Sequence, residues 1–299
     1  MTVNLNLHMA KKHKDDEFYT QFSEVANEMS YYTNSFRDKT ILCNCDNPDF
    51  SAFWRYFHLN FASLGLKKLI STYYTPDNRP VFKSEYTGGF DSDITVCSTH
   101  KLNGDGDFRS QECIDILNEA DIVITNPPFS LFREYVSILM QYHKQFCIIG
   151  TLNAVKYKEI FPLFQSNMIW LGANNGDMAF MVPSDSEERA TRYWVDESGQ
   201  KWRSLGNVVW LTNMDLAKRH TDIILTKHYS ELYYPKYDNY DAIDVSKVVD
   251  IPVDYDFTMG VPITFFTKYN PNQFRIVGKL SNGMIHGKKV YERILIQKI

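Results

Sequence analysis

Residues 121–129 read DIVITNPPF, and this stretch decides how the rest of the chain is interpreted. The apolar run 122–124 predicts a short strand that is buried on both faces, as in a parallel sheet. A helical pattern begins at Leu131, so residues 126–129 are expected at the carboxyl end of a strand. Open α/β sheets bind their ligands at that edge.

Helical and strand patterns alternate on both sides of this stretch. The expected helices cover residues 17–38, 50–66, 110–118 and 131–141. The expected strands cover residues 39–43, 68–74, 121–125 and 146–150. Such an alternation is typical of βαβ units around a parallel sheet. Between residues 75 and 110, Gly88-Gly89 separates two β-prone stretches, which predicts an inserted hairpin.

The pattern changes after residue 166. Strands are expected at 168–171 and 208–211, and residues 192–203 between them have the pattern of a β-hairpin with glycine in its loop. From about residue 215 the alternation fades, and tyrosine, aspartate and proline-containing turns dominate. We therefore expect a large α/β domain over residues 1–214 and a smaller α+β region over residues 215–299.

Composition restricts the class of protein. The net charge of −4 is not that of a protein that coats nucleic acid, although a local basic face remains compatible with it. The five cysteines form no C-x-x-C pair and are odd in number, which disfavours a disulfide framework and a zinc ribbon. No cluster of residues has the spacing of metal ligands, so we expect no metal.

The sequence predicts neither secretion nor membrane insertion. The N-terminus is polar and then basic, without the apolar core of a signal peptide. The longest apolar runs are far shorter than the roughly 20 residues that a membrane span needs. We expect a cytoplasmic protein with no membrane partner.

The residue types at 126–129 suit an acceptor that presents a planar amine, such as N6 of adenine. This amine is a poor nucleophile, because its lone pair is delocalised into the ring. The side-chain carbonyl of Asn126 and the backbone carbonyl of Pro127 can each accept one of its hydrogens. Two fixed acceptors aim the lone pair at a methyl donor. Pro128 stiffens the backbone, and Phe129 offers a ring on which an extruded base can stack.

The sequence also resembles a known family. The run DIVITNPPFSLF (121–132) contains the amino-methyltransferase motif D/N/S-P-P-Y/F/W. Together with YDNYDAI (237–243) and MGVPITF (259–265), it is similar to the EcoRI-type adenine-specific DNA methyltransferase family, from about Asp16 to near residue 278. The resemblance implies the Rossmann-like sheet of class I methyltransferases and a C-terminal target-recognition region. It also implies S-adenosylmethionine as methyl donor and double-stranded DNA as partner.

The resemblance further implies a set of cofactor-binding residues from several loops. They are Tyr19, Thr20, Cys45, Asp46, Pro48, Tyr73, Asp107, Phe108 and Asn126. Tyr19 and Thr20 would contact the methionine part of the cofactor, and Asp107 and Phe108 its adenine. The chain departs from the usual pattern in the loop 43–48, CNCDNP, which contains no G-x-G. A close approach of backbone to a cofactor normally favours glycine.

Other interpretations remain open from the residues alone. Cytosine N4, adenine in RNA and a protein glutamine amide present the same planar amine. A degenerate methyltransferase fold that only binds nucleic acid would also tolerate the missing G-x-G. We expect a monomer, and a cognate restriction endonuclease encoded nearby is a candidate partner. Weaker site candidates are Asn153 for the base pocket and, for phosphate contacts, Lys227, His228, Arg275, Lys279, His286, Lys288 and Lys289.

Overall fold

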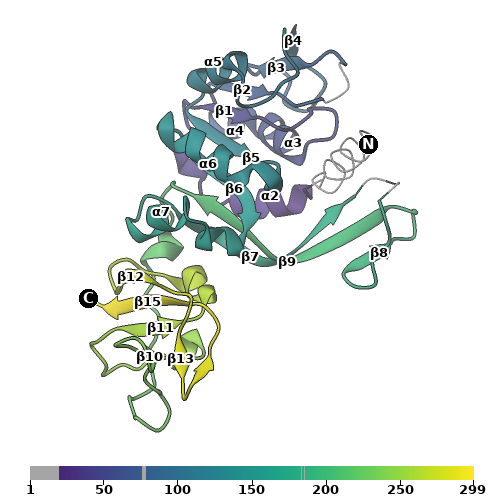
Figure 1. The fold of residues 1–299 in the computed structure, drawn as a ribbon. Helices are drawn as coiled ribbons and strands as arrows, with labels where there is room; N and C mark the ends of the chain where they lie inside the picture. Colours follow the sequence, from purple (N-terminus) through teal and green to yellow (C-terminus); the bar gives the residue numbers. More distant parts are fainter. Residues whose placement is uncertain (1–19, 76–78, 183, 185) are drawn as a thin grey trace. The chain divides into compact units, whose positions relative to one another are not determined.

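The computed structural model describes residues 20–75, 79–182, 184 and 186–299 (Figure 1). The chain divides into two compact units. The first comprises Met1–Thr151 and Gly172–Met214, and the second comprises Leu152–Leu171 and Asp215–Ile299. Each unit is built on a sheet of its own.

Within the described residues, the first unit holds a nine-stranded mixed sheet in the order β4-β3-β2-β1-β5-β6-β9-β7, with β8 paired to β9. The strands are β1 (Thr40–Cys43), β2 (Lys68–Ser71), β3 (Phe82–Tyr86), β4 (Ser98–Lys101), β5 (Ile122–Thr125), β6 (Gln145–Thr151), β7 (Trp170–Met181), β8 (Tyr193–Val195) and β9 (Lys201–Thr212). Strands β2, β1, β5 and β6 run parallel. Strands β3, β4, β8 and β9 pair antiparallel with their neighbours. The predicted α/β sheet with a parallel centre and antiparallel ends is confirmed.

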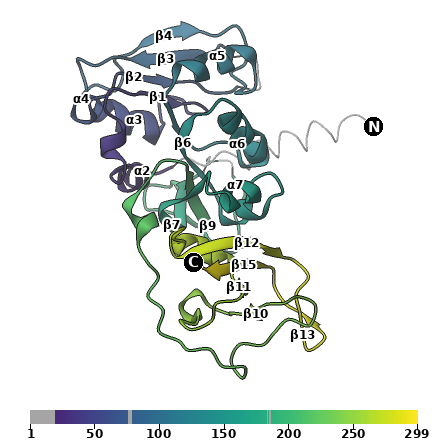
Figure 2. The same cartoon turned by 90° about the vertical axis from the view of Figure 1, so that its left-hand side faces the viewer.

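Helices cover both faces of the parallel strands (Figure 2). On one face lie α2 (Phe22–Met29), α3 (Ala52–Leu59) and α4 (Phe61–Leu64), and on the other lie α5 (Gln111–Glu119) and α6 (Phe132–Gln141). The chain runs from β1 to β2 on one side and later enters β5 on the other side of β1. The strand order therefore reverses between β1 and β5, and open α/β sheets bind ligands at such a switch point.

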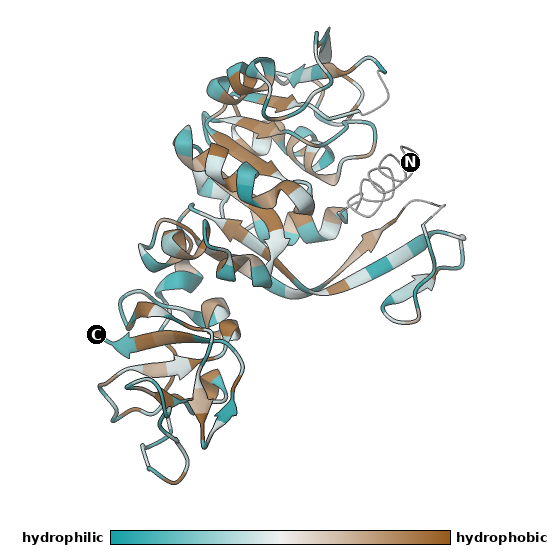
Figure 3. Cartoon of the chain, viewed as in Figure 1, coloured by the Kyte–Doolittle hydropathy of each residue, from teal (hydrophilic) through white to brown (hydrophobic). Residues whose placement is uncertain are grey.

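The central strands are buried along their whole length. Every residue of β1 and β5 is buried, and Ile41, Val123 and Ile124 have no exposed surface. Figure 3 shows the apolar character of these strands beside the more polar helices. Continuous burial without alternation indicates a sheet that is covered on both faces, as the run 122–124 predicts.

Two predicted helices differ in length from their sequence patterns. The helix predicted over 50–66 is divided at Asn60, whose side chain donates to the carbonyl of Tyr56 at 2.8 Å and competes with the helical hydrogen bonds. It ends at Gly65, whose φ of 66° is the left-handed conformation of a glycine cap. The helix predicted over 17–38 is described as α2 followed by a short 3-10 turn, Thr33–Ser35.

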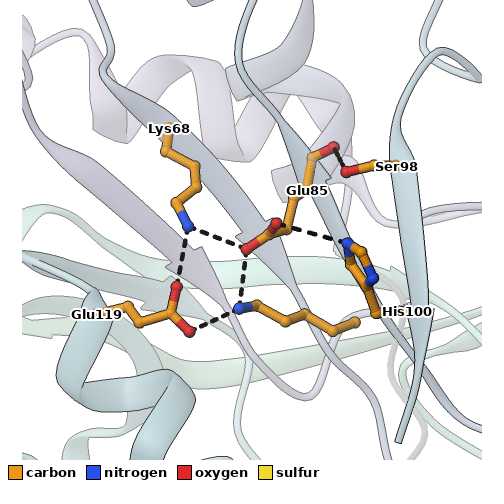
Figure 4. A network of polar contacts seen from close by, with 6 residues as sticks. Lys68, Glu85, Ser98, His100 and Glu119 are labelled. Atoms are coloured by element: carbon orange, nitrogen blue, oxygen red, sulfur yellow. Dashed lines mark hydrogen bonds and ion pairs between the residues drawn. The ribbon is translucent and has the colours of Figure 1, made fainter.

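The predicted hairpin insertion is confirmed as β3 and β4, which extend the sheet beyond β2. An ion-pair network fixes this insertion in place (Figure 4). Lys68 of β2 and Lys83 of β3 each contact both Glu85 and Glu119, with N–O distances from 2.6 to 3.0 Å. His100 of β4 approaches Glu85 at 3.9 Å. Because Glu119 is the last residue of α5, the network joins three strands and a helix.

Strands β7, β8 and β9 form a long arm at the opposite end of the sheet from β3 and β4 (Figure 1). The predicted hairpin between β8 and β9 is present, and Trp194 lies opposite Trp202. Their indole rings stack with centroids 6.2 Å apart and an interplanar angle of 8°. The indole N–H of Trp202 donates to the carboxylate of Asp196 at 2.7 Å, which fixes one ring of the pair.

The second unit contains a four-stranded sheet, within the described residues, in the order β10-β11-β15-β12. The strands are β10 (Ile243–Asp244), β11 (Met259–Val261), β12 (Phe274–Leu280) and β15 (Arg293–Lys298), and β13 (Met284–Ile285) pairs with β14 (Lys288–Lys289). The short helix α7 (Phe161–Gln165) contacts β12, and the 3-10 turn Ile263–Lys268 contacts β15. Across the described ranges, no helix has both the length and the apolar character needed to cross a membrane.

Candidate active site

Segments that follow β1, β2 and β5 meet at the switch point, together with the loop before α5. The N–H of Asp46, after β1, donates to the carbonyl of Thr72, after β2, at 2.9 Å. The strand predicted over 68–74 is shorter in the structure and ends at Ser71. Gly106 lies so close to the same segment that a Cβ on it would come within 1.9 Å of the carbonyl oxygen of Tyr73. The fold therefore brings residues that are far apart in the sequence to one edge of the sheet.

The four residues predicted for catalysis form the loop directly after β5. Pro127 is buried, while Asn126, Pro128 and Phe129 are partly exposed. Pro128 has an extended backbone, with φ −61° and ψ 123°, and the 3-10 turn Phe129–Leu131 then leads into α6. Because proline fixes φ, the carbonyl groups of this loop are held in set directions. The loop has a buried anchor and a partly exposed amide and ring.

Asp46 joins the loop after β1 to the loop 126–129, which is predicted to be catalytic. Its carboxylate accepts hydrogen bonds from the backbone N–H of Asn126, from the hydroxyl of Ser51 at 2.8 Å and from the hydroxyl of Thr125. Burial disfavours the charged form and outweighs these hydrogen bonds, so the pKa of Asp46 is raised to about 7. A carboxyl group that titrates near neutrality at the ligand-binding edge of a sheet is typical of a functional site.

The loop 43–48 makes its turn without glycine. Cys45 has a φ of 67°, in the left-handed region that usually favours glycine. Such a conformation costs roughly 1–2 kcal/mol for a residue with a side chain. Contacts on both sides hold it: the Tyr135 hydroxyl donates to the side chain of Asn44, and the Ser71 hydroxyl donates to the carbonyl of Asp46. The conformation expected of a G-x-G loop is thus partly reproduced by other residues.

Asp107 and Phe108 lie in the loop before α5. The ring of Phe108 is buried and packs edge-on against Tyr135, with centroids 5.0 Å apart. The carboxylate of Asp107 accepts from the Arg109 side chain at 2.6 and 2.9 Å. This guanidinium holds the pKa of Asp107 below its usual range, so the carboxylate is ionised at neutral pH. A buried ring beside an ionised acceptor suits a purine with an exocyclic amine.

The remaining residues predicted to bind the cofactor have different positions. Tyr19 lies outside the described residues. Thr20 is buried, and its hydroxyl oxygen has no hydrogen-bond partner within the described part of the chain. A buried hydroxyl such as that of Thr20 normally requires a partner. Together with the carboxyl of Asp46 and the ring of Phe108, the Thr20 hydroxyl gives a set of groups that fits S-adenosylmethionine. Pro48 is partly exposed in the turn before α3.

Three residues that support this site are not identified by the sequence patterns as functional: Asn44, Ser51 and Tyr135. Ser51 carries a recognisable signal, because a serine before an apolar helical run predicts a helix N-cap. Its side chain does accept from the N–H of Trp54 at 3.2 Å. The helical spacing of Tyr135 predicts burial but not a partner for its hydroxyl. No sequence signal indicates that Asn44 would accept from it.

The weaker candidates all belong to the second unit. Asn153 is exposed in the 3-10 turn Leu152–Lys156. His228, Arg275 and Lys279 bond to neighbouring groups of the same unit. Lys227, His286, Lys288 and Lys289 are exposed. The role of Asn153 in the base pocket and the roles of the other seven residues in phosphate binding remain predictions.

Comparison with known proteins reveals extensive similarity. Residues 6–298 match the family described as "Adenine-specific methyltransferase EcoRI". The chain is 47% identical to the type II methyltransferase M.EcoRI of Escherichia coli, over 99% of this chain and 97% of that protein. It is 37% identical to the type II methyltransferase M.MgeORF184P of Mycoplasma genitalium, over 97% of each chain. It is 39% identical to the type II methyltransferase M.MpnI of Mycoplasma pneumoniae, over 91% of this chain and 85% of that protein.

These matches agree with the geometry of the first unit. The Asn-Pro-Pro-Phe loop follows β5 at the switch point of the sheet, where an amine acceptor and a methyl donor can meet. The similarity is not confined to that loop, since it extends through both units. The protein therefore belongs to the EcoRI-type family of adenine-specific methyltransferases.

Proposed function

We propose that this protein transfers the methyl group of S-adenosylmethionine to N6 of one adenine within a defined sequence of double-stranded DNA, after the base has rotated out of the helix. The observation that carries this proposal is the position of residues 126–129 directly after β5, tied to Asp46 at the switch point of the sheet. The family relationship supports adenine in DNA as the acceptor.

The cofactor-binding groups come from the segments that meet at this edge. S-adenosylmethionine, when bound, supplies a methyl group on a positively charged sulfur. We assign Asp46 and Thr20 to its cationic methionine part, and Asp107 and Phe108 to its adenine. Asp107 already accepts from Arg109, but a carboxylate has about four acceptor positions and retains capacity for an amine. The rest of the proposed pocket comprises Tyr19, Cys45, Pro48, Tyr73 and the backbone of Asn126.

The acceptor base is held by the catalytic loop. Phe129 stacks on the extruded adenine, a contact worth about 1–3 kcal/mol. The side-chain carbonyl of Asn126 and the backbone carbonyl of Pro127 accept the two N6 hydrogens and direct the nitrogen lone pair. The cofactor would supply the methyl carbon and keep the electron pair of its carbon–sulfur bond, and one N6 proton would leave to solvent. The two carbonyls stabilise the positive charge that develops on N6 during the transfer.

We further propose that the second unit recognises the DNA sequence. The predicted recognition region, residues 215–299, forms most of that unit, and Leu152–Leu171 complete it. Each strand of a duplex must be methylated in a separate event, which suits a monomer. The type II names of the relatives support a cognate endonuclease as a partner in the cell.

The proposal is tested by incubating the full chain with methyl-labelled S-adenosylmethionine and unmethylated genomic DNA, followed by nucleoside analysis. Label in N6-methyladenine is the expected result. Label in N4-methylcytosine would show that cytosine, and not adenine, is the acceptor. Label in RNA or protein alone would show that DNA is not the substrate. A protein that binds DNA but no cofactor would be the degenerate binding module instead.

A further inference from the structure

One segment of the second unit is strongly basic. Residues 274–291 contain no aspartate or glutamate but contain four lysine or arginine residues, in a chain whose net charge is −4. Two of these cations, Lys288 and Lys289, lie next to His286 in the hairpin formed by β13 and β14. Residues 286–289 are all exposed. This hairpin, residues 284–289, is therefore a projecting element whose charge is complementary to phosphate.

The hairpin has a tight and well-defined turn. Ile285 pairs with Lys288, so only His286 and Gly287 lie in the loop. Their φ angles are 49° and 72°, and two positive φ angles in a two-residue loop identify a type I′ turn. That turn matches the twist of the flanking strands. The backbone at the tip thus has a specific conformation.

An isolated two-stranded hairpin is marginally stable in water, and this one is anchored from outside. Ile285 and, just after β14, Val290 pack against a buried cluster. The cluster consists of Tyr237, Ala242, Leu280 and Leu295. The N–H of Val290 also donates to the carbonyl of Gly283 at 2.9 Å. The apolar residues therefore attach the hairpin to the unit and leave its cationic residues exposed.

Asp238 clamps the turn itself. Its two carboxylate oxygens accept from the N–H of His286 at 3.2 Å and from the N–H of Gly287 at 2.8 Å. The neighbouring Asn239 accepts from the N–H of Met284 at 3.0 Å and donates to the carbonyl of Asn282 at 2.7 Å. Asn239 thus bonds to the start of β13, and Asp238 bonds to the turn of the hairpin.

The clamp belongs to the YDNYDAI segment at 237–243, and it is attached to the MGVPITF segment at 259–265. The hydroxyl of Tyr237 lies over Gly260, where a Cβ would come within 2.2 Å of it, and donates to Asp244 at 2.6 Å. The 237–243 segment therefore bonds to the hairpin and packs against the 259–265 segment.

We propose that the 284–289 hairpin enters the major groove of duplex DNA, with Lys288 and Lys289 at the phosphates, His286 at the base edges and Asp238 as the residue that positions the tip. A two-stranded ribbon fits the width of the major groove. A fixed turn places a side chain at base edges more precisely than a mobile loop does. This assignment rests on the proposed function, because it takes double-stranded DNA as the substrate.

The first test measures the affinity of the full chain for a fluorescent random-sequence duplex over a series of salt concentrations. The double variant Lys288→Gln/Lys289→Gln should bind more weakly, and the slope of log affinity against log salt should fall by about 2, one for each lost phosphate contact. The matched control is Lys236→Gln/Lys247→Gln, which removes two exposed cations elsewhere on the same unit and should leave the slope unchanged. An unchanged slope in the first variant would overturn the assignment.

The second test uses the sign of an electrostatic effect. Asp238→Asn removes a negative charge beside the basic hairpin, so simple attraction to DNA predicts tighter binding. Loss of the clamp predicts weaker binding, and this is the result we expect. Asp241→Asn, an exposed carboxylate three residues away, is the control and should bind DNA at least as tightly as the unmodified protein. Tighter DNA binding by Asp238→Asn would show that Asp238 does not position the tip of the hairpin.

Two outcomes separate this inference from the proposed function. If the unmodified protein methylates adenine in DNA and both hairpin variants bind and methylate DNA normally, the hairpin assignment fails and the proposed function stands. If the unmodified protein transfers no methyl group to DNA but the lysine variant still lowers the salt slope, the proposed function fails and the hairpin assignment stands.

Discussion

The carboxylate of Asp46 accepts a hydrogen bond from the backbone N–H of Asn126. This bond connects the loop after β1, which we assign to the cofactor, with the loop after β5, which we assign to the base. Thr125 contributes a second bond to the same carboxylate through its hydroxyl. The two loops are therefore joined in one hydrogen-bonded structure, and we expect a change at this carboxyl group to affect the binding of both substrates.

Replacement of Asn126 by alanine should abolish most of the chemistry while leaving the cofactor bound. The side-chain acceptor for N6 is lost, but the backbone N–H that holds Asp46 remains. Loss of one preorganised hydrogen-bonding group typically lowers the rate by a factor of about 100 to 1,000. We expect a fall of that size in single-turnover methyl transfer and little change in cofactor affinity by calorimetry. Asn118→Ala, at an exposed position of α5, is the control.

A contrary result for Asn126→Ala would be informative. Strong loss of cofactor binding in a folded variant would show that Asn126 serves the cofactor rather than the base. Normal transfer would mean that the Pro127 carbonyl alone orients the amine, and the catalytic role of Asn126 would then have to be withdrawn.

The pKa of Asp46 gives a prediction that depends on pH. With a pKa of about 7, its carboxyl is mainly protonated at about pH 6 and mainly ionised at about pH 8. S-adenosylmethionine carries a positive sulfur, whereas that of S-adenosylhomocysteine is neutral. Both ligands carry the same α-ammonium group, so an ionised carboxylate beside the sulfur favours S-adenosylmethionine alone. Its affinity relative to S-adenosylhomocysteine should then rise roughly tenfold over this interval.

The measurement is isothermal titration of both ligands at the two pH values. Taking the ratio of their affinities cancels the titration of groups that the ligands share. Asp46→Asn cannot ionise, so its ratio should be independent of pH. If the unmodified protein also gave a constant ratio, Asp46 would not face the sulfonium, and its role would be confined to holding the catalytic loop.

The sequence predicts the sheet and the position of the 126–129 loop after a buried strand well, for a physical reason. Continuous apolar runs such as 122–124 identify buried strands, and two prolines after such a run require the chain to leave the sheet. The inserted hairpin follows from the β-prone stretches on either side of Gly88-Gly89, although its loop covers residues 87–97 and is not a two-residue turn. These features depend on residues that are adjacent in the chain, so the sequence displays them directly.

The support of the site could not be predicted in the same way. That Cys45 would adopt a left-handed backbone depends on contacts from Tyr135 and Ser71, which are distant in the sequence. The raised pKa of Asp46 likewise arises from burial by several segments at once. The sequence shows that this loop contains no G-x-G. It could not show that Cys45 would adopt the left-handed backbone conformation that glycine usually provides.

Tyr135→Phe should reduce stability without removing the ring that packs against Phe108. The Tyr135 hydroxyl donates to the buried side chain of Asn44, and the phenylalanine variant leaves that acceptor without its donor. An unsatisfied buried acceptor costs about 1–3 kcal/mol in the free energy of unfolding. Denaturant unfolding should show a loss in this range. Tyr142 directly follows α6 and is partly exposed. As the control, Tyr142→Phe should change the free energy of unfolding very little.

Glu28→Gln should weaken the attachment of the β7–β9 arm to the rest of the first unit. Glu28 is completely buried, and burial raises its pKa. Its carboxylate accepts from the N–H groups of Ala173 and Asn174 at 2.8 and 2.7 Å, and from the hydroxyl of Tyr32 at 2.9 Å. Glutamine replaces one acceptor oxygen by an NH2 group, which would face these donors.

We expect Glu28→Gln to lose about 1.5–3 kcal/mol in the free energy of unfolding, the range for a hydrogen bond to a charged group. The amides at the start of β7 should also exchange with deuterium faster than those of β5, because only the former lose their acceptor. Glu24→Gln, one turn earlier on α2 and partly exposed, controls for the change of charge. Equal exchange in both variants would mean that strand pairing, rather than Glu28, holds the arm to the sheet.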